Sequence, residues 1–191
     1  MKKLLVLVIG LLATQLINAD YSYAQWGIGA GVEIRDEDPT TGVGIKLERS
    51  ILSNAPILDI NLRGHFSWFN DDDAESLRDQ LSNTNVTAYD YGLALVLGVK
   101  LGIVKPYVGA GAGTERYSEE RGTGQYFQEN NSSFINYSEN NLYWNGFGGA
   151  EITLLPYLKP FIEFRYSKLV DTDEIRIDNY NRLAIGVNFR F

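Results

Sequence analysis

The stretch Leu183-Ala184-Ile185-Gly186-Val187-Asn188-Phe189-Arg190-Phe191 alternates large apolar residues with small or polar ones at every position. Successive side chains of a β-strand point to opposite faces, so the apolar residues of this stretch share one face. The same period of two recurs in seven earlier segments, at 26–34, 43–48, 58–68, 89–100, 105–117, 142–154 and 161–167. Helical spacing of apolar residues is absent from these segments. The sequence therefore predicts an all-β chain of eight strands.

The amino-acid composition excludes several kinds of functional site and partner. The 191 residues suit one domain. The absence of cysteine excludes disulfides, zinc sites built on thiolates and cysteine nucleophiles, and the single histidine excludes a histidine-rich metal site. A formal net charge of −7 argues against a nucleic-acid partner, because nucleic-acid binders cluster Lys and Arg.

The first 24 residues are typical of a secretory signal peptide. A basic head, Met1-Lys2-Lys3, precedes an apolar run, Leu4 to Leu16, that is too short to span a bilayer as a helix. Small residues allow cleavage after Ala24, which we favour, or after Ala19; an uncleaved membrane anchor is the alternative. Residues 25–191 then form the exported domain. Loss of Lys2, Lys3 and Asp20 reduces 17 basic and 24 acidic residues to 15 and 23.

The connections between the predicted strands alternate in length. Short links carry Pro56, Pro106 and Pro156, whereas the links at 70–85, 118–141 and 169–181 are long and polar. Only the first link on the long side, 36–41, is short. Short turns at one end and long loops at the other are typical of an antiparallel up-and-down transmembrane β-barrel.

Aromatic residues gather near the strand ends, where two belts at membrane interfaces would lie. The turn side has Trp26, Tyr107, Tyr157, Phe161, Phe189 and Phe191, and the loop side has Phe66, Trp68, Tyr89, Tyr91, Trp144, Tyr166 and Tyr180. Alternation alone would also suit a soluble ligand-binding barrel with its apolar face inside. The belts favour an apolar face turned toward lipid.

The opposite face carries charges of both signs. These residues are Glu33, Lys46, Glu48, Asp59, Arg63, Asp90, Lys100, Glu115, Glu151, Glu163, Arg165 and Arg190. An eight-stranded barrel holds little besides its own side chains, so we expect an ionic network that plugs the lumen. The glycines at 27, 29, 31, 109, 111 and 113 would make room for these long side chains.

Two stretches resemble those of a known family. Lys105-Pro106-Tyr107-Val108-Gly109-Ala110-Gly111-Ala112-Gly113 and the terminal strand at 183–191 are similar to the small eight-stranded outer-membrane barrels, the OmpX type and the membrane domain of the OmpA type. The resemblance implies residence in the bacterial outer membrane, among its lipid and lipopolysaccharide. It also implies that the outer-membrane insertion machinery reads Phe191 as its signal.

One pair of residues hints at catalysis. His65 and Ser67 share a strand face, and Asp79 or Asp90 could orient the histidine. The pair resembles the His-x-Ser of the lipid A deacylases, which are outer-membrane barrels. In that family the pair faces lipid, whereas the alternation here turns His65 and Ser67 inward, so we expect them to fill the lumen and the protein not to be an enzyme.

The loops hold acidic clusters and aromatic residues. Asp36-Glu37-Asp38, and Asp71-Asp72-Asp73 with Glu75, could hold Ca²⁺ or bridge through Mg²⁺ to lipopolysaccharide phosphates, but solvated loop charge is the simpler interpretation. We therefore predict no metal site and no cofactor. The aromatic residues Tyr126, Phe127, Phe134, Tyr137 and Tyr143 could contact an extracellular partner, whose identity the sequence does not give.

The sequence thus predicts a non-enzymatic outer-membrane barrel with a structural or surface-interaction role through its long loops. The alternatives are a small-solute channel or uptake barrel, a lipid A modifying enzyme that uses His65 and Ser67, and a soluble barrel of the periplasm.

Overall fold

The computed structural model describes residues 26–52, 57–73, 84–122, 134–153, 157–170 and 179–191. The predicted signal peptide lies outside these residues. The described strands are β1 (Trp26–Arg35), β2 (Thr41–Leu52), β3 (Leu58–Asp73), β4 (Thr84–Val99), β5 (Val104–Gly122), β6 (Phe134–Ile152), β7 (Leu158–Val170) and β8 (Asn179–Arg190).

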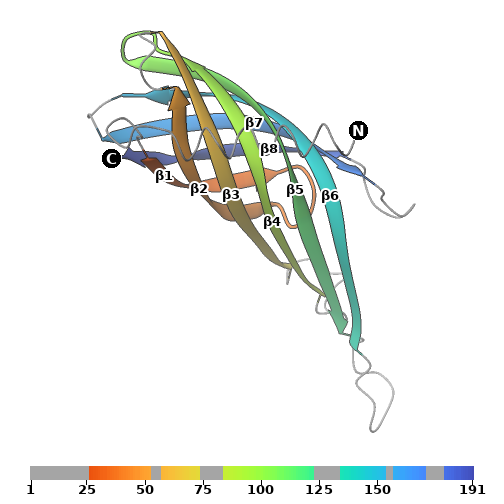
Figure 1. Cartoon of the computed structure of the whole chain (residues 1–191). Coiled ribbons are helices and arrows are strands. Elements are labelled where there is room, and N and C mark those ends of the chain that lie inside the picture. Colours follow the sequence, from red (N-terminus) through yellow and green to blue (C-terminus); the bar gives the residue numbers. More distant parts are fainter. Residues whose placement is uncertain (1–25, 53–56, 74–83, 123–133, 154–156, 171–178) are drawn as a thin grey trace, which may run out of the picture.

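Each strand pairs antiparallel with the next, and β8 pairs with β1, which closes the barrel (Figure 1). At this seam the backbone N–H groups of Trp26 and Phe191 each donate to the other residue's carbonyl oxygen, at 2.9 Å. Closure gives the strands a partner on both sides. The prediction of an eight-stranded antiparallel up-and-down barrel is confirmed.

The links divide the barrel into two ends. The β2–β3, β4–β5 and β6–β7 links meet at one end, which we call the turn end, together with Trp26 and Phe191. The other four links, which include the described 36–40 segment, meet at the loop end. Among the residues that the structure describes, no helix is long and apolar enough to cross a membrane.

Side chains alternate between the wall and the lumen along every strand. In β4, Leu93 and Leu95 are 63% and 47% exposed on the outside, whereas Ala94 and Val96 between and beyond them are 4% and 3% exposed. The apolar face therefore covers the outside of the barrel, which is the arrangement that a hydrocarbon environment requires.

Four strands are longer than the apolar pattern predicts. Strands β5 and β6 have 19 residues each, and β3 and β4 have 16 each, so the predicted loops at 118–141 and 70–85 are wrong in their bounds. The extensions hold mainly polar residue types on both faces and show no apolar alternation, yet their backbones pair in regular ladders from Ser118 to Gly122. Hydrophobic periodicity cannot reveal such strands.

Glycines make room for lumen side chains at several inward positions. A Cβ atom at Gly29 would lie 2.8 Å from Lys46 Cε, and one at Gly109 would lie 2.3 Å from Phe147 Cζ. Gly27 differs, because the nearest atom to a Cβ there would be 3.5 Å away. The space is therefore used by aromatic rings as well as by the long charged side chains that the sequence suggested.

Candidate functional site

Charged side chains from every strand fill the lumen. The following are each at most 8% exposed: Glu33, Arg35, Lys46, Glu48, Asp59, Arg63, Asp90, Lys105, Glu115, Glu151, Glu163, Arg165 and Arg182. Burying an ionised group is costly unless it is paired and hydrogen-bonded, so the contacts among these groups decide whether the barrel is stable. They form two clusters, one toward each end.

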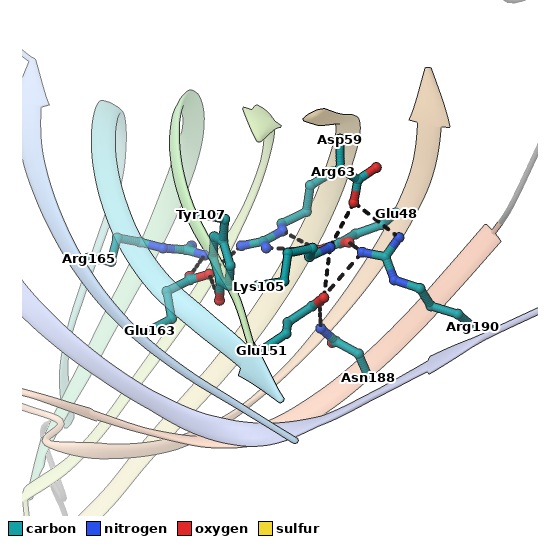
Figure 2. Close-up of polar contacts among 10 residues, drawn as sticks. All are labelled: Glu48, Asp59, Arg63, Lys105, Tyr107, Glu151, Glu163, Arg165, Asn188 and Arg190. Atoms are coloured by element: carbon teal, nitrogen blue, oxygen red, sulfur yellow. Dashed lines mark hydrogen bonds and ion pairs between the residues drawn. The ribbon is translucent and has the colours of Figure 1, made fainter. Parts of the chain in front are cut away.

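Arg63 lies at the centre of the turn-end cluster (Figure 2). Its Nε and Nη2 atoms contact Glu48 Oε1 at 2.8 and 2.7 Å, and its Nη1 atom pairs with Glu163 on the opposite wall. Glu163 also accepts from Arg165 at 2.7 Å and from the Tyr107 hydroxyl at 2.9 Å. The guanidinium thus links β2 and β3 to β7 across the barrel.

The same cluster continues toward the end of β8. Lys105 Nζ bridges Asp59 at 2.8 Å and Glu151 at 2.7 Å. Arg190 contacts Glu48 at 3.0 Å, and Asn188 donates to Glu151 at 2.5 Å (Figure 2). Each carboxylate of the turn-end cluster therefore meets at least one cation.

The loop-end cluster is built on two arginines. Arg182 pairs with Asp90, with Glu33 at 2.9 Å, and donates to the Ser67 hydroxyl at 3.2 Å. Arg35 contacts Glu115 at 2.6 Å and donates to the backbone oxygen of Pro39. The centroid of the Phe69 ring lies 4.5 Å from the Arg35 guanidinium carbon and 4.7 Å from that of Arg182, so the ring contacts both cations.

Lys46 lies between the clusters in an aromatic setting. Its Nζ atom is 3.2 Å from the centroid of the Phe161 ring and 5.9 Å from that of Tyr107. A cavity beside it, lined in part by Glu33, Lys46 and Arg165, has a volume of about 10 Å³. That is room for about one water molecule beside Lys46.

His65 and Ser67 lie inside the barrel but have different partners. His65 Nε2 is 2.8 Å from the Tyr143 hydroxyl and 3.5 Å from Asp90 Oδ1, whereas Ser67 accepts from Arg182. Both side chains are buried. The arrangement gives Ser67 a cation rather than a general base and puts it out of reach of a lipid substrate. Asp79, the other predicted orienting acid, lies outside the described residues.

Lys100 and Tyr107 lie elsewhere than the sequence suggested. Lys100 is exposed beyond the end of β4, because β4 ends at Val99 and the chain turns there, so it is not buried in the lumen. Tyr107 is 4% exposed inside the barrel rather than in a belt. It shares strand parity with Lys105 and Gly109, and this signal would have placed it inside.

The other predicted residues fall into two groups, those that lie in the lumen and those that point outward. The remaining charged residues assigned to the lumen lie inside it. Of the aromatic residues assigned to belts, these point outward: Trp26, Phe66, Trp68, Tyr89, Tyr91, Trp144, Tyr157, Tyr166, Phe189 and Phe191. Phe161 and Tyr180, like Tyr107, are buried in the lumen instead. Sequence reasoning missed Arg35, Lys105 and Arg182, although each has the inward parity of its strand.

No group of three or more metal-ligating side chains occurs in the described part of the chain. In the 36–38 cluster, Asp36 accepts from the backbone N–H and the side-chain amide of Asn181, at 2.8 and 2.7 Å. The side chains of the 71–75 cluster lie outside the described residues. Of the aromatic residues predicted for the loop, Phe134 and Tyr137 belong to β6, Tyr143 faces the lumen, and Tyr126 and Phe127 are not described.

The chain matches the model of a known protein family. Residues 4–191 match the model of the outer membrane protein beta-barrel domain. A search of curated proteins gave no match.

Solved structures with a similar fold include those of three bacterial proteins. Neisserial surface protein A is 16% identical, with a TM-score of 0.58 over 88% of this chain and 97% of that one. A major outer membrane protein from Thermus thermophilus is 14% identical, with a TM-score of 0.66 over 88% and 99%. Ail, the attachment invasion locus protein of Yersinia pestis, is 16% identical, with a TM-score of 0.54 over 88% and 97%. At these identities the likeness extends to the fold.

Proposed function

We propose that this chain, which belongs to the outer membrane protein beta-barrel domain family and resides in the bacterial outer membrane, acts without catalysis through its loop end. In this proposal the barrel is a closed support, and the surface that it carries outward makes the contacts. The observation that carries the proposal is the packing of the lumen by the turn-end and loop-end clusters.

The packing argues against passage of solutes. A solute would have to displace Arg63 from Glu48 and Glu163, then Arg182 from its two carboxylates, each in a water-poor lumen. Breaking a buried ion pair costs about 3–5 kcal/mol. Two such barriers in series would make steady conduction slow.

The packing also supports a non-enzymatic role. Ser67 is turned inward and holds Arg182, so the His-x-Ser pair lacks both the activated hydroxyl and the lipid-facing position that a lipid A modifying enzyme needs. The name of Ail, an attachment invasion locus protein, fits a surface role for one barrel of similar fold.

Planar-bilayer conductance tests the proposal. We expect the purified protein to give no steady openings, while a variant with Arg63→Ser and Arg182→Ser, which empties part of each cluster, shows more current. Both proteins must first show the heat-modifiable gel shift of a folded barrel. Steady large openings from the unaltered protein would instead support the small-solute channel.

Lipid A analysis tests the second alternative. Mass spectrometry of lipid A from cells with and without the protein should give the same species. A new deacylated or otherwise altered species that disappears with Ser67→Ala would contradict the non-enzymatic proposal.

A further inference from the structure

A polar hollow lies on the outside of the barrel wall, away from the lumen. It has a volume of about 950 Å³ and spans β3 to β6 near the loop end. Arg116 is the charged residue of its lining, and the polar neighbours are Thr87, Thr114, Ser118 and Asn140. Arg116 pairs with Tyr89 on β4 and with Asn140 on β6, so these three side chains form one outward row.

Two hydroxyl groups in the lining of this hollow already donate hydrogen bonds. Thr87 donates to Asn70 at 3.1 Å, and Thr114 donates to the backbone oxygen of Asn141 at 3.2 Å. Arg116, Ser118 and Asn140 also line the hollow and carry further donor groups. Such a group of donors around one arginine suits an anion such as a phosphate.

A second hollow, which is apolar, adjoins the first. It has a volume of about 480 Å³ and is lined by Ile45, Leu47, Gly64 and Leu93 among others. Gly64 opens it, because an added Cβ there would meet only Leu93 Cδ2, at 3.6 Å. Phe66 and Tyr91 line both hollows, so the two hollows adjoin at these rings, and together we call them the wall groove.

The wall groove is therefore amphipathic along its length. Its apolar part lies against the mid-strand residues of β1 to β4, and its polar part, with a positive charge, lies toward the loop end. Loops of outer-membrane barrels face outward, so the polar part is at the headgroup level of the outer leaflet. The positive charge is notable in a chain with a net charge of −7.

We propose that the wall groove is a binding site for a phosphorylated, acylated glycolipid of the outer leaflet, the lipid A portion of lipopolysaccharide. Arg116 binds a phosphate group, the rings of Phe66 and Tyr91 lie beside the sugar-to-acyl junction, and one acyl chain fills the apolar part over Gly64. This inference is independent of the lumen, because the groove and the two clusters lie on opposite faces of the same wall.

Native mass spectrometry of the detergent-solubilised, folded protein with purified lipid A tests this. Removal of Arg116 in Arg116→Gln should weaken lipid A retention about ten- to a hundredfold, the range for a hydrogen bond to a charged group. Gly64→Leu, which fills the apolar part, should also weaken it. Dephosphorylated lipid A should bind the unaltered protein as weakly as lipid A binds Arg116→Gln.

Matched controls come from the same wall. Arg49→Gln removes an outward arginine near Trp26 at the turn end, and Gly146→Leu adds a side chain at an outward glycine with no atom within 4 Å of its Cβ position. Both should retain lipid A as the unaltered protein does, and all variants must show the folded gel shift. Equal losses in Arg49→Gln and Arg116→Gln, equal retention of dephosphorylated lipid A, or equally tight binding of phosphatidylglycerol would each overturn the proposal.

Discussion

Replacement of Arg63 by methionine would remove the main tie across the lumen. The Arg63 side chain is 1% exposed, and its two carboxylate partners, Glu48 and Glu163, are 4% and 2% exposed. The guanidinium carbon also lies 4.8 Å from the Phe147 ring and 5.2 Å from the Tyr107 ring. Methionine would keep much of the packing volume but none of the charge.

The expected loss of unfolding free energy depends on the cations that still contact Glu48 and Glu163 in Arg63→Met. Loss of one partner from a buried ion pair costs about 3–5 kcal/mol of unfolding free energy, because the other charge stays buried. Glu48 keeps Arg190 at 3.0 Å, and Glu163 keeps Arg165 at 2.7 Å. These remaining cations place the expected loss toward the lower end of that range.

Urea titration of the protein folded in lipid vesicles, followed by the heat-modifiable gel shift, measures this loss. Arg49→Met is the matched control, since Arg49 faces outward, and it should cost about 1 kcal/mol or less. Glu163→Gln combined with Arg63→Met should cost less than the two single changes added together, because the double variant has no uncompensated Glu163 charge. If Arg63→Met were as mild as Arg49→Met, the turn-end cluster would not be what holds the walls together.

Three further outcomes are expected. Leu95→Arg, on the outer face of β4, should lower the unfolding free energy by about 2–4 kcal/mol, while Ala94→Ser on the lumen side should matter far less; reversed effects in the same titration would mean that the faces are assigned backwards. Gly186→Ala should cost about 1–3 kcal/mol, because its Cβ would lie 2.2 Å from the backbone oxygen of Ala30, whereas Gly146→Ala should be tolerated. Phe191→Ala should reduce the folded protein in outer membranes severalfold without reducing refolding in detergent, if Phe191 is the insertion signal; the control Phe164→Ala, on the outer wall, should assemble normally, and equal yields from all three proteins would remove that role.

The faces of the strands could be predicted from the sequence because side-chain alternation is a local property of the backbone. Parity placed Glu33, Glu48 and Asp90 inside without any knowledge of their partners. For Tyr107, the place of an aromatic residue near a strand end favours a belt, whereas its parity favours the lumen, and parity is right. Lys100 was misplaced because parity holds only as far as the strand does, and β4 ends one residue earlier.

The partners inside the lumen could not be predicted. Arg182 and Glu33 are 149 residues apart in the chain, and Arg63 and Glu163 are 100 apart. Their contacts depend on the register of all eight strands and on how far the closed sheet is sheared. The wall groove was equally hidden, since its lining comes from neighbouring strands, with Gly64 on β3, Leu93 on β4 and Arg116 on β5.

The unequal strand lengths give the barrel an uneven outer rim. At about 3.3 Å per residue, the 10 residues of β1 extend about 30 Å, whereas the 19 residues of β5 and of β6 extend about 60 Å (Figure 1). The wall of the barrel is therefore tall at β5 and β6 and short at β1, on the opposite flank. A large molecule that moves along the cell surface would contact the long strands β5 and β6 from the side before it reached the open end of the barrel.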